Sequence, residues 1–214
     1  MIFTGLLLSV TIIITLLIPS NTIDATRSSD DEKDERKKKR IIRLALLRPF
    51  GTEQISSISD SFVDWNNYLP CDLKHKNNSD EEVIVDIFLS FSQSYGNNLN
   101  AQASAEKMLG LFLSNRNTEK EGWARCFRNI HLIEANIPPS KDLYLPTEAN
   151  TNELWVNGPN QQYLSSMEQI MKNNEERYDA VLLLEYDCAP IKQFWLDTFV
   201  AEAETGDSFA ILGR

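Results

Sequence analysis

The sequence predicts an α/β domain built on an open, mostly parallel sheet with helices on both faces. Three observations indicate this fold class. Short apolar runs alternate along the chain with stretches in which apolar residues recur at helical spacing. The runs are almost continuously apolar, which is typical of strands buried on both faces of a parallel sheet. Strand and helix signals also follow one another in turn, as they do where helices connect parallel strands.

Five apolar runs are the predicted strands, and most of them contain β-branched or aromatic residues, which favour strands. They span residues 41–47, 83–91, 131–137, 179–184 and 209–212. Turn residues follow the first run at 48–51, and Pro138 and Pro139 follow the third. The fourth run is the most apolar of the five.

Helical stripes separate these strands. The stripes consist of Ile55, Ile58, Phe62 and Trp65; of Ala101, Ala105, Met108 and Phe112; of Tyr163, Met167, Ile170 and Met171; and of Trp195, Phe199 and Ala203. Within each stripe the residues are mostly three or four apart, which places them on one face of a helix. Each helix is therefore predicted to cover the sheet with that face.

Two segments precede the domain. The first 18 residues carry no charged side chain, so we expect residues 1–20 to form an apolar N-terminal helix, either a signal peptide or a signal anchor. Residues 21–40 are densely charged and are predicted to be a disordered stem, leaving 41–214 as the domain. We expect the secretory pathway: a type II Golgi membrane protein or a lumenal protein, secreted if the leader is cleaved. Against this topology, the basic residues follow the apolar run, an arrangement that favours a cytoplasmic domain.

The composition excludes several classes of protein. With 42% hydrophobic and 24% charged residues, the chain is neither collagen-like nor wholly disordered. Its 31 acidic and 21 basic residues give a formal charge of −10, which repels nucleic-acid backbones. We expect no nucleic acid among its partners, and we expect a phosphate-bearing ligand to be held through a cation.

Two carboxylates, Glu185 and Asp187, follow the fourth strand directly. Ligands of parallel sheets bind beyond the carboxyl ends of strands, and side chains two residues apart on a strand point the same way. We therefore expect both carboxylates to converge on one Mn²⁺ or Mg²⁺ ion, which prefers oxygen ligands and can hold a diphosphate. The alternative is structural: the two acids cap the next helix or pair with Lys192 or Arg177.

The segment 178–213 resembles the central part of the GT-A-type nucleotide-diphospho-sugar transferases. In that family a hydrophobic strand ends in an Asp-x-Asp-like triplet, followed by a proline and a Trp-Leu-Asp helix. The matching residues here are Glu185-Tyr186-Asp187, Pro190 and Trp195-Leu196-Asp197. The opening strand 41–51 is similar to the family's first strand, and residues 157–161 to the turn and helix before its metal strand.

The resemblance implies a Rossmann-like, GT-A-like sheet and a metal-dependent glycosyltransferase. Asp187 would bind the Mn²⁺ or Mg²⁺ that bridges to the diphosphate of a nucleotide-diphospho-sugar donor, and Glu185 would lie near the metal or the donor ribose. The donor nucleotide would be bound by Arg48, Pro49, Phe50, Gly51, Asn157, Gly158 and Gln161. The acceptor would be a glycan, a protein or a lipid.

Members of this family normally continue into an acceptor-binding half, so we expect the domain 41–214 to be incomplete at its C-terminus. No catalytic residue can be assigned. The alternative function is a non-catalytic lumenal binding or interaction module with a degenerate transferase fold. A different phosphate-handling enzyme, such as a metal-dependent hydrolase, is the third hypothesis.

The three cysteines, Cys71, Cys126 and Cys188, lack the spacing of a zinc site. Two alternatives stay open: all three thiols are free, or, in an oxidising lumen, Cys71 pairs with Cys126 and leaves Cys188 buried. Asn77 begins a glycosylation sequon, which agrees with a lumenal glycoprotein.

Overall fold

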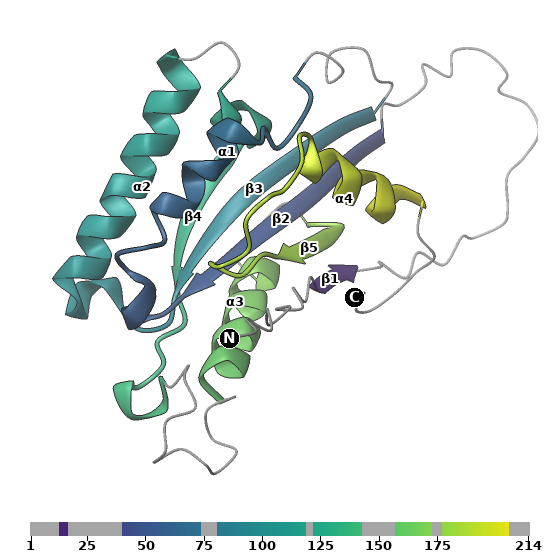
Figure 1. Ribbon diagram of the computed structural model, residues 1–214. Helices are drawn as coiled ribbons and strands as arrows, with labels where there is room; N and C mark the ends of the chain where they lie inside the picture. Colours follow the sequence, from purple (N-terminus) through teal and green to yellow (C-terminus); the bar gives the residue numbers. More distant parts are fainter. Residues whose placement is uncertain are drawn as a thin grey trace, which may run out of the picture.

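The computed structural model describes residues 13–16, 40–73, 81–118, 122–142, 157–172 and 177–205. These residues form one sheet with the strand order β1-β5-β2-β3-β4 (Figure 1). The strands are β1 (Ile13–Leu16), β2 (Arg40–Phe50), β3 (Glu81–Phe91), β4 (Asn129–Glu134) and β5 (Ala180–Leu183), and the α-helices are α1 (Asp64–Asn67), α2 (Leu99–Thr118), α3 (Asn157–Lys172) and α4 (Trp195–Thr205). Short 3₁₀ helices occupy residues 52–54, 60–62, 95–97, 123–126 and 139–141.

The four strands β2 to β5 are parallel, which confirms the predicted sheet. Strand β2 lies between β3 and β5, and β3 lies between β2 and β4. Along the chain the strands therefore proceed from β2 through β3 to β4, and then return to the opposite side of β2 with β5. In open parallel sheets, ligands bind where this reversal places two strand ends beside each other. Here that place is the carboxyl end of β2 and β5.

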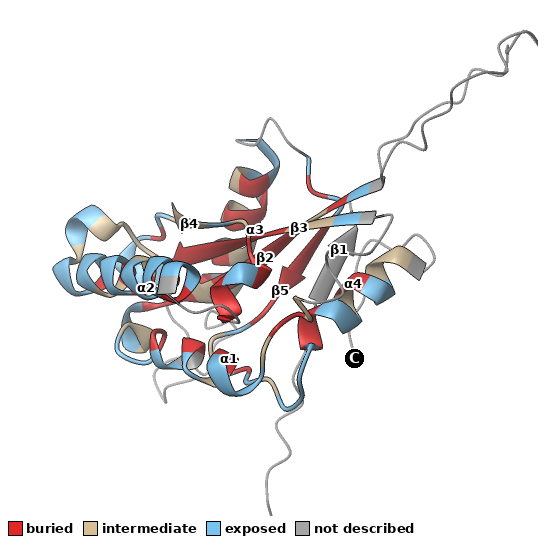
Figure 2. Cartoon of the chain, turned by 90° about the horizontal axis from the view of Figure 1, so that it is seen from above, coloured by how far each residue is buried: buried red, intermediate tan, exposed pale blue. Residues whose placement is uncertain are grey.

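Helices cover both faces of the sheet, as predicted. Leu44 and Leu46 of β2 pack into the larger core, which includes residues of α1, α2 and α4. Ala45 and Leu47 point the other way and pack with Met167 of α3. Figure 2 shows the buried strands between these two layers, with α3 on the opposite side from α1 and α4. The alternation along β2 follows from the two-residue period of a strand.

The stripe that begins at Ile55 does not form one continuous helix. Ile58, Phe62 and Trp65 are buried, as expected, but the backbone forms two 3₁₀ turns before the single turn of α1. Serine residues interrupt this segment, and the Ser57 hydroxyl donates to the carbonyl oxygen of Gln54 (3.1 Å). Such local bonds compete with a regular helix. The buried face was therefore predicted correctly and the helix was not.

The expected apolar N-terminal helix is not confirmed. Within residues 1–20 the structure describes only Ile13–Leu16, and these form β1, antiparallel to β5. Among the described helices, none combines the length and apolar character that a membrane span requires. The remainder of the leader, the stem up to residue 39, the sequon at Asn77 and the strand expected at 209–212 lie outside the described residues.

Candidate functional site

The two predicted metal ligands lie in a turn that follows β5. This strand ends at Leu183, and the Leu184 amide still donates to the Leu47 carbonyl oxygen of β2 (2.9 Å). The Cys188 amide then donates to the Glu185 carbonyl oxygen (3.1 Å), which closes a turn over residues 185–188. We call residues 185–188 the acidic turn. The expectation that Glu185 and Asp187 share one face of a strand is wrong, because the strand ends two residues earlier.

Both carboxylates of the acidic turn are accessible. Glu185 and Asp187 are exposed, and partial desolvation together with the charge of Asp187 raises the pKa of Glu185. Among the described residues, no hydrogen bond or salt bridge engages either carboxylate, and neither Lys192 nor Arg177 pairs with them. The structural alternative of a capped helix or an ion pair is thus not observed in the described part of the chain.

The acidic turn offers at most two side-chain ligands to a cation. In the described ranges, no group of three or more His, Cys, Asp or Glu residues could hold a metal ion. Mg²⁺ is commonly held by one or two carboxylates together with substrate phosphates and water. Two exposed, unpartnered carboxylates fit that donor set, whereas a metal site made only of protein ligands would need more.

Arg48 lies behind the acidic turn. Its side chain is fully buried at the carboxyl end of β2, and Nη2 donates to the carbonyl oxygen of Tyr186 (3.2 Å), with a longer contact to that of Glu185 (3.5 Å). The guanidinium also lies over the rings of Phe62 (5.8 Å) and Trp65 (5.3 Å). Burial lowers the pKa of Arg48 to about 10, so the group remains charged at neutral pH. Arg48 therefore supports the turn from inside the protein.

The other residues expected to bind the nucleotide at the end of β2 are also mostly buried. Phe50 is fully buried and its ring packs against Phe91 (5.3 Å between centroids). Gly51 is buried, and its amide donates to Gln54 Oε1 (2.7 Å). Only Pro49 remains partly exposed. The structure therefore places Phe50 in the core, and Pro49 is the member of this group that a ligand could reach.

The second group expected at the nucleotide begins α3. Gly158 is buried and Gln161 is exposed, while the side chain of Asn157 lies outside the described residues. One residue that joins α3 to the sheet, and which the sequence analysis missed, is Gln162. It is fully buried, and its Nε2 donates to the carbonyl oxygens of Ser90 (2.6 Å) and Phe50 (3.1 Å). Its spacing could have identified it. Gln162 lies four residues before Ser166 and eight before Ile170, which places all three on the same buried face of the helix.

A second set of carboxylates lies near the carboxyl ends of β3 and β4, and the sequence analysis did not identify it. Asp142 Oδ2 accepts hydrogen bonds from Ser92 Oγ (2.8 Å) and Gln93 Nε2 (2.6 Å). Glu134 Oε1 accepts from the Tyr95 amide (2.8 Å) and from Ser94 Oγ (3.2 Å). Each of these carboxylates accepts hydrogen bonds through one oxygen, unlike those of the acidic turn, although Asp142 Oδ1 is buried and accepts none from the described residues.

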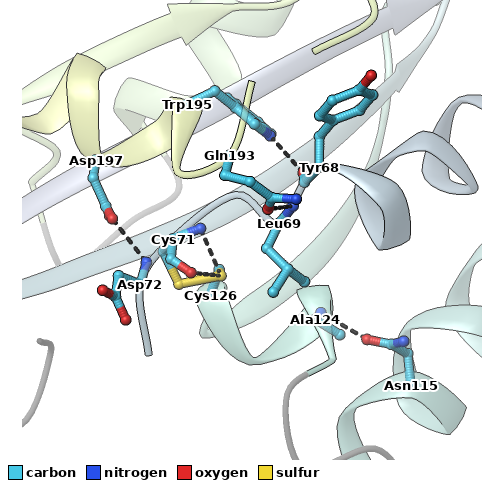
Figure 3. Close-up of a disulfide and its surroundings, with 10 residues drawn as sticks. All are labelled: Tyr68, Leu69, Cys71, Asp72, Asn115, Ala124, Cys126, Gln193, Trp195 and Asp197. Carbon is cyan, nitrogen blue, oxygen red and sulfur yellow. Dashed lines mark hydrogen bonds between the residues drawn. A yellow bond between two sulfur atoms is a disulfide. The ribbon is translucent and has the colours of Figure 1, made fainter. Parts of the chain in front are cut away.

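Of the two alternatives for the cysteines, the structure shows the disulfide. Cys71 and Cys126 are bonded, with their Cα atoms 5.6 Å apart (Figure 3), and Cys188 is a free, buried thiol. Burial and the nearby carboxylates raise the pKa of Cys188, so a smaller fraction of this thiol is ionised to the thiolate. A cavity of about 230 Å³ adjoins Cys188 and is lined mainly by apolar side chains, among them Leu184, Trp195 and Phe199.

Comparison of the chain with models of known protein families, with curated proteins and with solved structures gave no significant match.

Proposed function

We propose that the chain is a metal-dependent glycosyltransferase that binds a nucleotide-diphospho-sugar together with Mn²⁺ or Mg²⁺. The observation that carries the proposal is the pair Glu185 and Asp187. Their carboxylates are exposed, make no hydrogen bond or salt bridge to a described residue, and are located where β5 lies beside β2. Two adjacent negative charges attract a divalent cation. In a chain with a formal charge of −10, that cation would provide the positive charge that a diphosphate needs.

The residues around the turn suit this role. Asp187 and Glu185 would hold the cation, which, when bound, would act as a Lewis acid on the departing nucleoside diphosphate. Arg48 holds the Tyr186 carbonyl oxygen (3.2 Å), and so keeps the turn in place at the end of the sheet. Pro49, which is partly exposed at the end of β2, is in a position to contact the nucleotide. A fixed donor is attacked more readily by an acceptor hydroxyl because the reactants are already oriented.

The disulfide supports the proposed location. Disulfides persist in oxidising compartments and are rare in the cytosol, and Cys71 is bonded to Cys126. This supports our proposal that the domain belongs to the secretory pathway, either in the Golgi or secreted.

Calorimetry of the full chain tests the proposed function. Uridine and guanosine diphosphate are titrated with and without Mn²⁺, and binding that requires Mn²⁺ is expected. Asp187→Asn should weaken it by more than about 100-fold, because loss of an outer partner of a metal ligand already costs about 10- to 100-fold. The matched control is Glu202→Gln, an exposed carboxylate on α4, which should bind as the wild type does. Absent binding, or binding independent of Mn²⁺, would contradict the proposal.

A second candidate function is a non-catalytic binding or interaction module that retains the donor site. It is favoured by the donor set, since the described residues offer no third ligand group beside the acidic turn. Release of nucleoside diphosphate from nucleotide sugars distinguishes the two. Mn²⁺-dependent binding with release supports the transferase, and the same binding without release supports the module.

A further inference from the structure

Direct hydrogen bonds hold the acidic turn where the chain enters it, but not where the chain leaves it. Its entrance is fixed by β5 and by the bond from Arg48 to the Tyr186 carbonyl oxygen. At its exit, residues 189–192 are largely exposed, and no hydrogen bond from another described residue holds them. The first fixed point after Cys188 is Gln193. Whatever fixes Gln193 therefore limits how far Asp187 can move.

Gln193 is bound to residues 67–72, which we call the docking segment. Its Oε1 accepts a hydrogen bond from the Leu69 amide (2.8 Å), and its Nε2 donates to the Asn67 carbonyl oxygen (2.7 Å). The next residue, Phe194, donates its amide to the Leu69 carbonyl oxygen (2.7 Å). Phe194 has a φ of 59°, a left-handed conformation that a bulky residue rarely adopts unless its surroundings impose it.

The docking segment also holds the start of α4. The Leu196 amide donates to the Pro70 carbonyl oxygen (2.9 Å), Trp195 Nε1 donates to that of Tyr68 (3.2 Å), and the Asp72 amide donates to Asp197 Oδ2 (2.8 Å). Figure 3 shows the hydrogen bond of Trp195 to Tyr68 and that of Asp72 to Asp197 near the disulfide.

The disulfide fixes the docking segment itself. Cys71 belongs to the segment, and its bond to Cys126 attaches it to the 3₁₀ helix between α2 and β4. The Ala124 amide of that helix donates to Asn115 Oδ1 of α2 (2.8 Å). A continuous set of contacts thus connects helix α2 to Gln193 through the disulfide and the docking segment.

We propose that Gln193 is a positioning residue for the acidic turn. Its hydrogen bonds to Asn67 and Leu69 attach residues 189–193, which leave the turn, to the docking segment. The disulfide in turn restrains the docking segment. The carboxylate of Asp187 is thereby held between two supports, Arg48 before it and Gln193 after it. The effect on ligand binding rests on the proposed function, whereas the effect on the order of the turn does not.

Gln193→Met tests this role, because methionine keeps the length of the side chain and loses both hydrogen bonds. Hydrogen exchange of the Cys188 amide, which closes the turn, is expected to become about tenfold faster, which corresponds to about one net hydrogen bond. The affinity for Mn²⁺ with uridine diphosphate is expected to fall by a similar factor. Gln193 is exposed, so the variant should fold, and Gln193→Ala serves as a second variant.

The control is Ser104→Ala, which removes a hydrogen bond of α2 to the Ile55 carbonyl oxygen (2.9 Å) without touching the turn or the docking segment. It should leave exchange at Cys188 and the affinity unchanged. The inference would be overturned if the Cys188 amide of Gln193→Met exchanged at the wild-type rate. It would also be overturned if Ser104→Ala accelerated that exchange as much as Gln193→Met does. If the wild type binds no diphosphate, the proposed function fails, and exchange at Cys188 still decides the role of Gln193.

Discussion

The carboxylates of this protein differ between the two halves of the sheet. In the half formed by β3 and β4, Asp86, Glu134 and Asp142 each accept hydrogen bonds from protein donors. At the end of β5, the carboxylates of Glu185 and Asp187 accept none from the described residues, although the carbonyl oxygen of Glu185 does. The first group is committed to the structure. The second is exposed and available to a ligand.

Asp86 is the extreme case of the first group. Its side chain is fully buried in β3; Oδ1 accepts from Arg128 Nε (3.1 Å), and Oδ2 accepts from the Tyr178 hydroxyl (2.6 Å). The hydrogen bond and charge of Asp86, together with desolvation as the largest cause, raise the pKa of Tyr178. A buried charge of this kind is tolerated because it is paired.

The largest effect on stability is therefore expected from Asp86→Ala. Removing one partner of a buried ion pair costs about 3–5 kcal/mol. Because the side chain of Arg128 is 34% exposed and can be hydrated once its countercharge is lost, we expect a loss at the lower end of that range. The free energy of unfolding in urea measures the loss. Tyr178→Phe, which removes a single hydrogen bond to Asp86, should cost only about 1 kcal/mol. A loss below about 1 kcal/mol in Asp86→Ala would mean that the pair contributes no more than a surface ion pair does.

Asp142→Ala is expected to have an intermediate effect. It removes the acceptor of two hydrogen bonds, from Ser92 and Gln93, and a partly buried donor left without an acceptor costs about 1–3 kcal/mol. Asp142→Asn retains one acceptor oxygen and should lose less. Chemical denaturation of both variants measures the difference. If Asp142→Ala also weakened the Mn²⁺-dependent binding of diphosphate, Asp142 would belong to the ligand site. The distinction between structural and ligand-binding carboxylates would then fail.

Asp187→Ala is expected to change the stability of the metal-free protein by no more than about 0.5 kcal/mol, which is typical of exposed positions without specific contacts. The same variant should abolish Mn²⁺-dependent binding. Thermal unfolding with and without Mn²⁺ measures both effects, because only the wild type should be stabilised by the metal. If Asp187→Ala destabilised the metal-free protein as much as Asp142→Ala does, Asp187 would belong to the structural group.

The smallest effect concerns pH. The pKa of Glu185 is raised above its usual 4.5 by desolvation and by Asp187, so the folded protein binds this proton more tightly than the unfolded chain. Its contribution to stability is complete below pH 4.5 and is lost as the pH rises through the raised pKa. Unfolding of the metal-free wild type, compared with Glu185→Gln, should show a small decrease just above pH 4.5 that the variant lacks. Mn²⁺ should remove the decrease, since it stabilises the charged form.

The local patterns of the sequence were sufficient for the parallel strands and for α2, α3 and α4, but not for the helix expected from Ile55 or for the expected apolar N-terminal helix. The runs that contain Leu44, Val85 and Val181 became parallel strands, because apolar residues of this density can be buried only in a sheet covered on both faces. The stripe of α2 was correct at all four positions, from Ala101 to Phe112. In α3 the stripe was wrong at Met171, which is 52% exposed, because Gln162 and Ser166 complete the buried face instead.

The sequence by itself determined the α/β class, the position of the acidic pair after the last described strand and the candidate disulfide, since each depends on residue types and on spacing along the chain. Only the tertiary structure decided that β5 lies beside β2, that Glu185 and Asp187 occupy a turn, and that Arg48 is buried behind them. Those features arise from contacts between residues more than a hundred positions apart, such as Arg48 and Tyr186. No local periodicity encodes them, because the energy of such contacts is gained only once the sheet has assembled.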